Sequence, residues 1–236
     1  MGKILLVTGT DTGVGKTVAA AWLAKILASH AKVALVKAVQ TGADPLVDGD
    51  EASYKSLTNN PAIATYTLAS FPEPLAPSIA ARRAGKKISP TTIVQRCLAI
   101  AKGHDFTIVE GAGGLLVPIA KGFDFADLAK ALKASLVVVI RPGLGTLNHT
   151  MLTVEAAERR GLHIEALILN GFSPKRTVVE VENLRFLRAR YPKLPLITLE
   201  KARKAQLAKL HLKPGVYGAL PPLLQRLARD SSRMSR

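Results

Sequence analysis

Short runs of aliphatic residues recur along this chain, and each run is about as long as a β-strand. Stretches in which apolar residues have helical spacing separate these runs. Aliphatic runs without polar alternation are typical of strands buried on both faces, as in parallel sheets that helices cover from both sides. The sequence therefore predicts an α/β fold whose strands are 4–7, 33–36, 106–109, 136–140, 166–169 and, more weakly, 194–197.

The stretches between these runs predict helices. One region has a less regular pattern than the rest. Segment 41–88 has scattered proline and glycine, so we expect it to be the least regular part of the chain. Long connections after strand ends tend to carry the functional site in such sheets. The predicted helices are 16–29, 91–101, 148–160, 179–189 and 205–210.

Composition limits the classes of protein to consider. The chain has 236 residues, of which 48% are apolar, enough for one domain with a sizeable core. We expect a single domain over residues 1–224 and a basic, frayed tail over 225–236. The one cysteine, Cys97, excludes a disulfide scaffold and reads as a packed helix residue rather than a nucleophile. Neither a membrane span nor a signal peptide is recognisable, so a cytoplasmic protein is expected.

The charge of the chain is strongly basic and unevenly distributed. The net charge is +16, and residues 173–236 contribute +11 of it, with 15 basic and 4 acidic residues. A basic segment can bind nucleic acid or a membrane, or it can simply form a solvated surface. No motif that reads nucleic acid accompanies it. We therefore interpret the charge as solvated surface and expect neither nucleic acid nor a membrane as a partner.

A glycine-rich loop follows the first predicted strand and opens the first predicted helix. It reads Gly9-Thr10-Asp11-Thr12-Gly13-Val14-Gly15-Lys16-Thr17. In this context backbone amides and a helix N-terminus bind phosphates, the lysine reaches the terminal phosphates and the threonine hydroxyl ligates magnesium. Five residues rather than four separate Gly9 from Gly15, so the loop is a lengthened variant. It predicts a P-loop NTPase-like fold that binds ATP and Mg²⁺.

Two further groups follow predicted strands. Lys37 and Thr41 come after the second strand, where Lys37 is either a ligand-binding residue or a solvated lysine. Glu110 ends the third strand and precedes three glycines, and an acidic residue at this edge is the usual partner of the loop's magnesium. Asp48 or Asp50 could complete the metal site, or either could be a turn residue.

These motifs together resemble the dethiobiotin synthetase family. The resemblance runs from about residue 3 to residue 174 and includes the lengthened loop. Lys37 with Thr41, the run 109–114, the run Pro74-Leu75-Ala76-Pro77 and the run 145–150 each resemble a family motif. Asn170 resembles the residue that reads adenine, and Gly171 stands where the family often has an aspartate.

The resemblance implies a role for each matching residue. Lys16 and Lys37 would be catalytic, and Thr17, Asp50 and Glu110 would hold Mg²⁺. Residues implied to bind the nucleotide are Thr12, Gly13, Val14, Gly15, Lys16, Thr17, Val18, Asp50, Glu110, Gly111, Ala112, Gly113, Asn170 and Gly171. Residues implied to bind the substrate are Thr10, Lys37, Thr41, Pro74, Pro77, Gly145, Thr146, Leu147 and Asn148.

The resemblance also implies an activity: ATP-dependent closure of a ureido ring from 7,8-diaminononanoate and CO2, in a homodimer with the substrate site at the interface. The alternative is a partition or positioning ATPase of similar fold that binds DNA or membrane, which the basic charge favours. Such ATPases carry a lysine early in the loop, in a Lys-Gly-Gly run. Asp11-Thr12-Gly13 stands there instead, which argues against the alternative.

Overall fold

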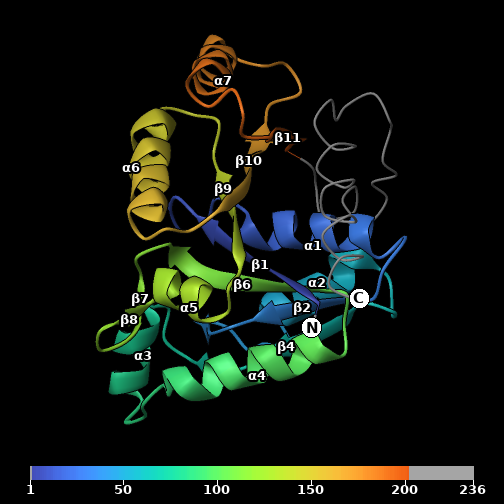
Figure 1. Cartoon of the computed structure of the whole chain (residues 1–236), viewed down its shortest axis with the longest axis vertical. Helices are drawn as coiled ribbons and strands as arrows, with labels where there is room; N and C mark the ends of the chain where they lie inside the picture. The colour runs from blue at the N-terminus through green and yellow to red at the C-terminus, as the bar shows by residue number, and fades with distance from the viewer. Residues whose placement is uncertain (1, 202–236) are drawn as a thin grey trace.

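The computed structural model describes residues 2–201 and has a seven-stranded parallel sheet at its centre (Figure 1). The strand order is β11-β10-β9-β1-β6-β2-β4. The strands are β1 (Lys3–Gly9), β2 (Val33–Lys37), β4 (Ala64–Thr67), β6 (Phe106–Gly114), β9 (Ser135–Ile140), β10 (Ile164–Phe172) and β11 (Leu196–Glu200). Two small sheets pair β3 (Gln40–Thr41) with β5 (Ser70–Phe71), and β7 (Pro118–Ala120) with β8 (Phe123–Asp124).

Helices cover both faces of the central sheet, as the aliphatic strands predict. Figure 1 shows α1 and α4 on opposite sides of β1, β2 and β6. Two separate cores result: α1 and α2 pack on one face, and α3 to α7 pack on the other. The helices are α1 (Lys16–Leu27), α2 (Asp50–Thr58), α3 (Pro77–Arg83), α4 (Pro90–Lys102), α5 (Phe125–Ala131), α6 (Thr146–Arg159) and α7 (Val178–Arg190).

The region 41–88 is more regular than the sequence predicts. It contains α2, α3, the short strands β3 and β5, and the seventh strand β4 of the main sheet. Strand β4 has the sequence Ala-Thr-Tyr-Thr and is only partly buried, because it lies at the edge of the sheet. An edge strand does not need the aliphatic run that marks a central strand, and this explains why it was not predicted.

Other differences concern lengths. Helix α5 was not predicted, the sixth strand lies two residues later than expected, and β6 continues to Gly114. Glu110 is therefore inside β6 rather than at its end. The expected helix 205–210 and the expected tail 225–236 lie outside the described residues.

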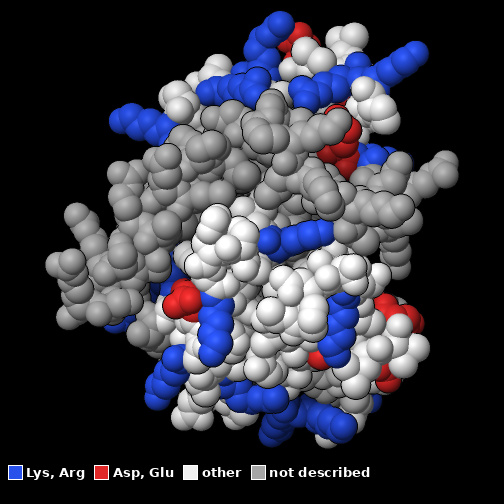
Figure 2. Space-filling view, turned by 90° about the vertical axis from the view of Figure 1, so that its right-hand side faces the viewer, with Lys and Arg blue, Asp and Glu red and all other residues white. Residues whose placement is uncertain are grey.

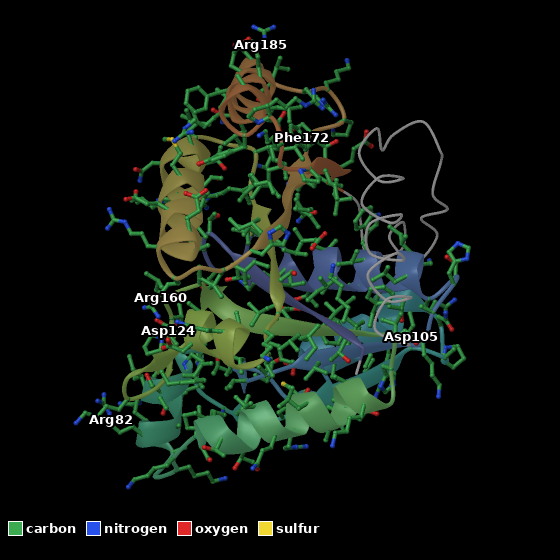
Figure 3. The ribbon with its side chains drawn as sticks, viewed as in Figure 1. Arg82, Asp105, Asp124, Arg160, Phe172 and Arg185 are labelled. Atoms are coloured by element: carbon green, nitrogen blue, oxygen red, sulfur yellow. The ribbon has the colours of Figure 1, made fainter. Side chains whose placement is uncertain are left out.

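Side-chain contacts at helix ends connect neighbouring elements. Asp124 and Asp127 form a capping box at the start of α5. Arg160, just after α6, donates to Asp124 at 3.0 Å and to Asp127 at 2.9 Å, and Figure 3 shows Arg160 beside Asp124. The pairs fix the end of α6 against the start of α5.

Cys97 is fully buried in α4, as expected for a packed helix residue. Burial raises the pKa of its thiol to about 12, which keeps it protonated and unreactive. Within residues 2–201 we find no helix that is both long and apolar enough to cross a membrane.

Candidate active site

The glycine-rich loop joins β1 to α1 at the carboxyl edge of the sheet. Gly13 and Gly15 have φ angles of 74° and 90°, in the left-handed region that favours glycine. A β-carbon on Gly15 would also collide with the side-chain amide of Asn170. Lys16 folds back over the loop, and its Nζ donates to the carbonyl of Asp11 at 3.1 Å. This backbone shape leaves the amides at the start of α1 directed toward the site.

Lys37 lies between two carboxylates. Strand β6 separates β1 from β2, and the register places Glu110 directly beside Lys37. Lys37 Nζ lies 2.8 Å from Glu110 Oε1 and 2.6 Å from Asp50 Oδ2. Lys37 and Glu110 are only 4% and 1% exposed. The interpretation of Lys37 as a solvated lysine is therefore wrong.

The Thr17 hydroxyl completes this group of oxygens. It lies 2.7 Å from Asp50 Oδ1 and 3.1 Å from Glu110 Oε1. One hydroxyl and two carboxylates from three separate elements thus meet within hydrogen-bonding distance. Oxygen ligands of this kind suit Mg²⁺.

The charges in the cluster shift one another's pKa values. Burial lowers the pKa of Lys37, but the carboxylates of Glu110 and Asp50 outweigh it and hold that pKa above its ordinary value. Burial raises the pKa of Asp50, but the Lys37 ammonium outweighs it and lowers that pKa. For Lys16, burial dominates and lowers the pKa. Lys37 and Asp50 are therefore both held in their charged forms.

The structure resolves the choice between the two aspartates of the connection after β2. Asp50 begins α2 and faces the cluster, and its backbone amide donates to Gln40 Oε1 at 2.9 Å. Asp48 instead accepts from the amide of Asp44 at 2.8 Å and closes the turn before α2. Of these two aspartates, only Asp50 reaches the Thr17 hydroxyl.

A cavity of about 610 Å³ opens over this cluster. Fourteen of the predicted residues line it: Thr12, Gly13, Gly15, Lys16, Thr17, Val18, Lys37, Thr41, Asp50, Pro74, Pro77, Glu110, Ala112 and Gly113. Most of the residues that line the cavity were therefore predicted from the sequence. Residues 74–77 line the same cavity as the glycine-rich loop.

The other predicted residues do not line the cavity. Val14 is buried, and its carbonyl accepts from Asn170 Nδ2 at 3.0 Å, so Asn170 of β10 contacts the loop. Thr10, Gly111 and Gly171 also lie outside the lining. The run Gly145, Thr146, Leu147 and Asn148 opens α6, away from the cavity.

Several residues near the cluster were not predicted. Gln40, Ser53, Leu57 and Val117 also line the cavity, and so do Leu75 and Ala76, which belong to the run 74–77 that the sequence analysis named. Tyr54 lies behind it, and its hydroxyl donates to Glu110 Oε2 at 2.7 Å. The one available signal was the spacing of Tyr54 from Asp50, because residues four apart share a helix face.

Curated relatives match this chain over most of its length. A protein of Rhodococcus erythropolis named ATP-dependent dethiobiotin synthetase is 44% identical over 181 residues, 75% of this chain and 79% of that one. A protein of the same name from Anaeromyxobacter dehalogenans is 46% identical over 176 residues, 72% of this chain and 78% of that one. This chain belongs to the dethiobiotin synthetase family. It is accordingly an ATP-dependent ligase of the type that forms C–N bonds.

Other comparisons agree with a dethiobiotin synthetase of P-loop fold. A family model described as an AAA domain matches residues 3–222. The McdA protein of Cyanothece in complex with ATP aligns with a TM-score of 0.58 at 15% identity, covering 99% of this chain and 96% of that one. A ParA family ATPase of Chlorobium tepidum aligns with a TM-score of 0.54 at 16% identity, covering 86% and 85%. At these identities the likeness shows the fold alone.

Proposed function

We propose that this protein converts 7,8-diaminononanoate, CO2 and ATP into dethiobiotin, ADP and phosphate. The observation that carries the proposal is the placement of Lys16 and Lys37 on one cavity, beside the oxygen cluster of Thr17, Asp50 and Glu110. Two cations and a set of hard oxygen ligands suit a reaction in which anionic oxygens meet a triphosphate. The identity to the curated relatives supports the choice of substrate.

In this proposal Thr17, Asp50 and Glu110 hold Mg²⁺. The donor set fits the ion, because all three side chains offer oxygen and they converge from α1, α2 and β6. A bound magnesium ion would neutralise charge on the phosphate oxygens. The residues of the glycine-rich loop would bind the phosphates through their backbone amides.

The reaction needs positioning and charge stabilisation rather than a protein nucleophile. One amine of the substrate adds to CO2 and releases a proton, which gives a carbamate. A carbamate oxygen attacks the γ-phosphorus, ADP leaves and a carbamic–phosphoric anhydride forms. The second amine attacks the carbonyl carbon, phosphate leaves and the ring closes. Lys37 would stabilise the carbamate oxygens, and Lys16 would stabilise the transferred phosphoryl group.

The substrate carboxylate would bind at the start of α6, where the amides of Leu147 and Asn148 have no partner within the helix, whereas the amide of Thr146 donates to the carbonyl of Gly143 at 3.3 Å. These residues do not line the cavity of the same chain. We therefore propose a homodimer in which the α6 N-terminus of one copy completes the site of the other. Leu144, just before this helix, and Leu152, in its middle, support it, because they are 82% and 56% exposed.

One assay tests the activity. The full chain is incubated with ATP, Mg²⁺, bicarbonate and the diamine, and ADP and dethiobiotin are both measured. We expect ADP release that requires the diamine and matches the amount of dethiobiotin formed. ADP release at the same rate with and without the diamine would contradict the proposal.

The role of Lys37 is tested by Lys37→Met, which keeps most of the side-chain volume. We expect product formation to fall by about 100-fold or more, because charge stabilisation at the carbamate is lost, while ATP affinity measured in EDTA changes only slightly. Lys55→Met removes an exposed lysine that pairs with Glu51 on α2 and serves as the matched control. Equal losses of ATP binding and turnover in Lys37→Met would show that Lys37 acts on the nucleotide instead.

A partition-type ATPase is the second candidate, favoured by the net charge. Figure 2 shows basic side chains of the described residues spread over the face drawn there rather than gathered in one stripe. Because no motif that reads nucleic acid accompanies the basic charge, we expect no DNA binding at physiological salt. Salt-sensitive retention of a DNA duplex would favour the second candidate.

A further inference from the structure

The buried carboxylate of Glu110 is bonded on both oxygens. Oε1 accepts from Lys37 Nζ at 2.8 Å and lies 3.1 Å from the Thr17 hydroxyl. Oε2 accepts from the Tyr54 hydroxyl at 2.7 Å. Within residues 2–201, Tyr54 is the one donor to Oε2. Its hydrogen bond therefore holds Oε2, while Lys37 and Thr17 contact Oε1.

Tyr54 is itself rigidly held. Its side chain is fully buried and packs in the core that α1 and α2 form on one face of the sheet. A phenol hydroxyl is protonated at neutral pH, so Tyr54 is the donor and the Glu110 carboxylate is the acceptor.

Tyr54 also stands one helical turn after Asp50 on α2. Residues four apart lie on the same face of a helix, so α2 presents both side chains to the cluster. Asp50 contacts the Thr17 hydroxyl directly, whereas Tyr54 contacts Glu110 from behind. One helix thus supplies an oxygen ligand and also orients a second ligand that belongs to β6.

We propose that Tyr54 is a positioning residue for magnesium: it fixes Glu110 Oε2, so that Oε1 is turned toward Thr17 and Asp50. The inference rests on the magnesium site proposed above and adds a residue that does not line the cavity. Side chains that orient a metal ligand through its outer atoms typically change metal affinity by about 10- to 100-fold. Tyr54 would act on the metal without touching substrate or nucleotide.

The test is Tyr54→Phe, which removes one oxygen atom and keeps the ring. The affinity for the ATP analogue AMPPNP is measured by calorimetry, once with Mg²⁺ and once with EDTA. We expect the affinity in EDTA to stay as in the wild type. The gain in affinity on adding Mg²⁺ should fall by about 10-fold.

Two further variants make the result specific. Tyr66→Phe is the matched control, because Tyr66 packs against the core on the other face of the sheet and its hydroxyl makes no hydrogen bond within the described residues. Placing 4-aminophenylalanine at position 54 restores a donor of nearly the same shape and should recover most of the gain. Tyr54→Met is a second donor-free variant should Tyr54→Phe fail to fold.

An unchanged gain in the donor-free variants would overturn the proposal. So would an equal loss of affinity with and without Mg²⁺, which indicates a structural role only. If the AMPPNP affinity of the wild type is the same with and without Mg²⁺, the proposed magnesium site is wrong. This inference is then wrong as well. None of these measurements uses the diamine, so their outcome is independent of the assay for ring closure.

Discussion

At the scale of single residues, the site consists of charged side chains, two of which, Lys37 and Glu110, are buried. Glu110 and Lys37 sit side by side on adjacent strands, and Asp50 reaches the same ammonium from α2. A buried charge is costly unless it is paired and hydrogen-bonded. Lys37 and Asp50 therefore each depend on the opposite charge nearby to remain charged.

Cys97 shows the opposite case, a titratable group that burial keeps neutral. The pKa of its thiol is raised from 9.0 to about 12. As the pH rises past 9 the unfolded chain releases this proton first, so the free energy of unfolding decreases until about pH 12. We expect Cys97 to contribute a loss of about 1 kcal/mol between pH 9 and pH 10.

This loss is measured by urea unfolding of the wild type and of Cys97→Ala at each pH. The difference between the two proteins should shrink as the pH rises. In parallel, a thiol reagent should react with the native protein only after urea is added. A free energy difference that does not change with pH, or fast reaction of the native thiol, would show that Cys97 is accessible to water.

At the scale of elements, several helices begin at capped residues. Thr177 precedes α7 and accepts from the amide of Glu180 at 3.2 Å, while Glu180 Oε2 accepts from the amide of Thr177 at 2.7 Å. Glu180 also accepts from the amide and the hydroxyl of Ser173, each at 3.0 Å. The cap thus connects the end of β10 to α7.

We predict that Thr177→Ala lowers the free energy of unfolding by about 1 kcal/mol, because an amide at the start of α7 loses its acceptor. Thr177→Ser keeps a hydroxyl at the same position and should cost much less. Urea unfolding monitored by circular dichroism measures both variants. Equal losses would mean that the methyl group of Thr177, rather than its hydroxyl, stabilises the helix.

At the scale of the whole molecule, the sheet order decides which residues meet. Strand β6 lies between β1 and β2, so the glycine-rich loop, Glu110 and Lys37 arrive at one edge from distant parts of the chain. The start of α6 lies outside this cavity. That separation is the reason for proposing that a second copy completes the site.

We predict that Leu152→Glu weakens the proposed dimer by roughly 30-fold or more, because a charge would replace a buried apolar contact. Sedimentation velocity should show a shift from dimer to monomer. The KM for the diamine should rise while the affinity for AMPPNP stays unchanged. Val178→Glu is the matched control on α7, where Val178 is also highly exposed. A monomeric wild type with full activity would contradict this arrangement.

The residues by themselves determined the type of fold and the place of the glycine-rich loop. Continuous aliphatic runs can only be buried on both faces, so the parallel sheet and its two helical layers followed from local pattern. The glycine-rich loop was equally local, because its glycines and Lys16 are adjacent in the chain. The edge strand β4 was missed because a half-exposed strand needs no aliphatic run. The buried helix α5 was missed as well.

The tertiary structure alone decided which side chains share the site. The strand register places Lys37 beside Glu110. The start of α2 brings Asp50 to the Thr17 hydroxyl, whereas Asp48 bonds to Asp44 in the preceding turn. Tyr54 of α2 joins the site because its hydroxyl contacts Glu110 of β6, which is 56 residues away in the chain. Such contacts depend on how distant elements pack, and the sequence carries no local pattern for them. The physical reason is that hydrogen bonds of buried charges are satisfied in three dimensions, by whichever element the packing brings within reach.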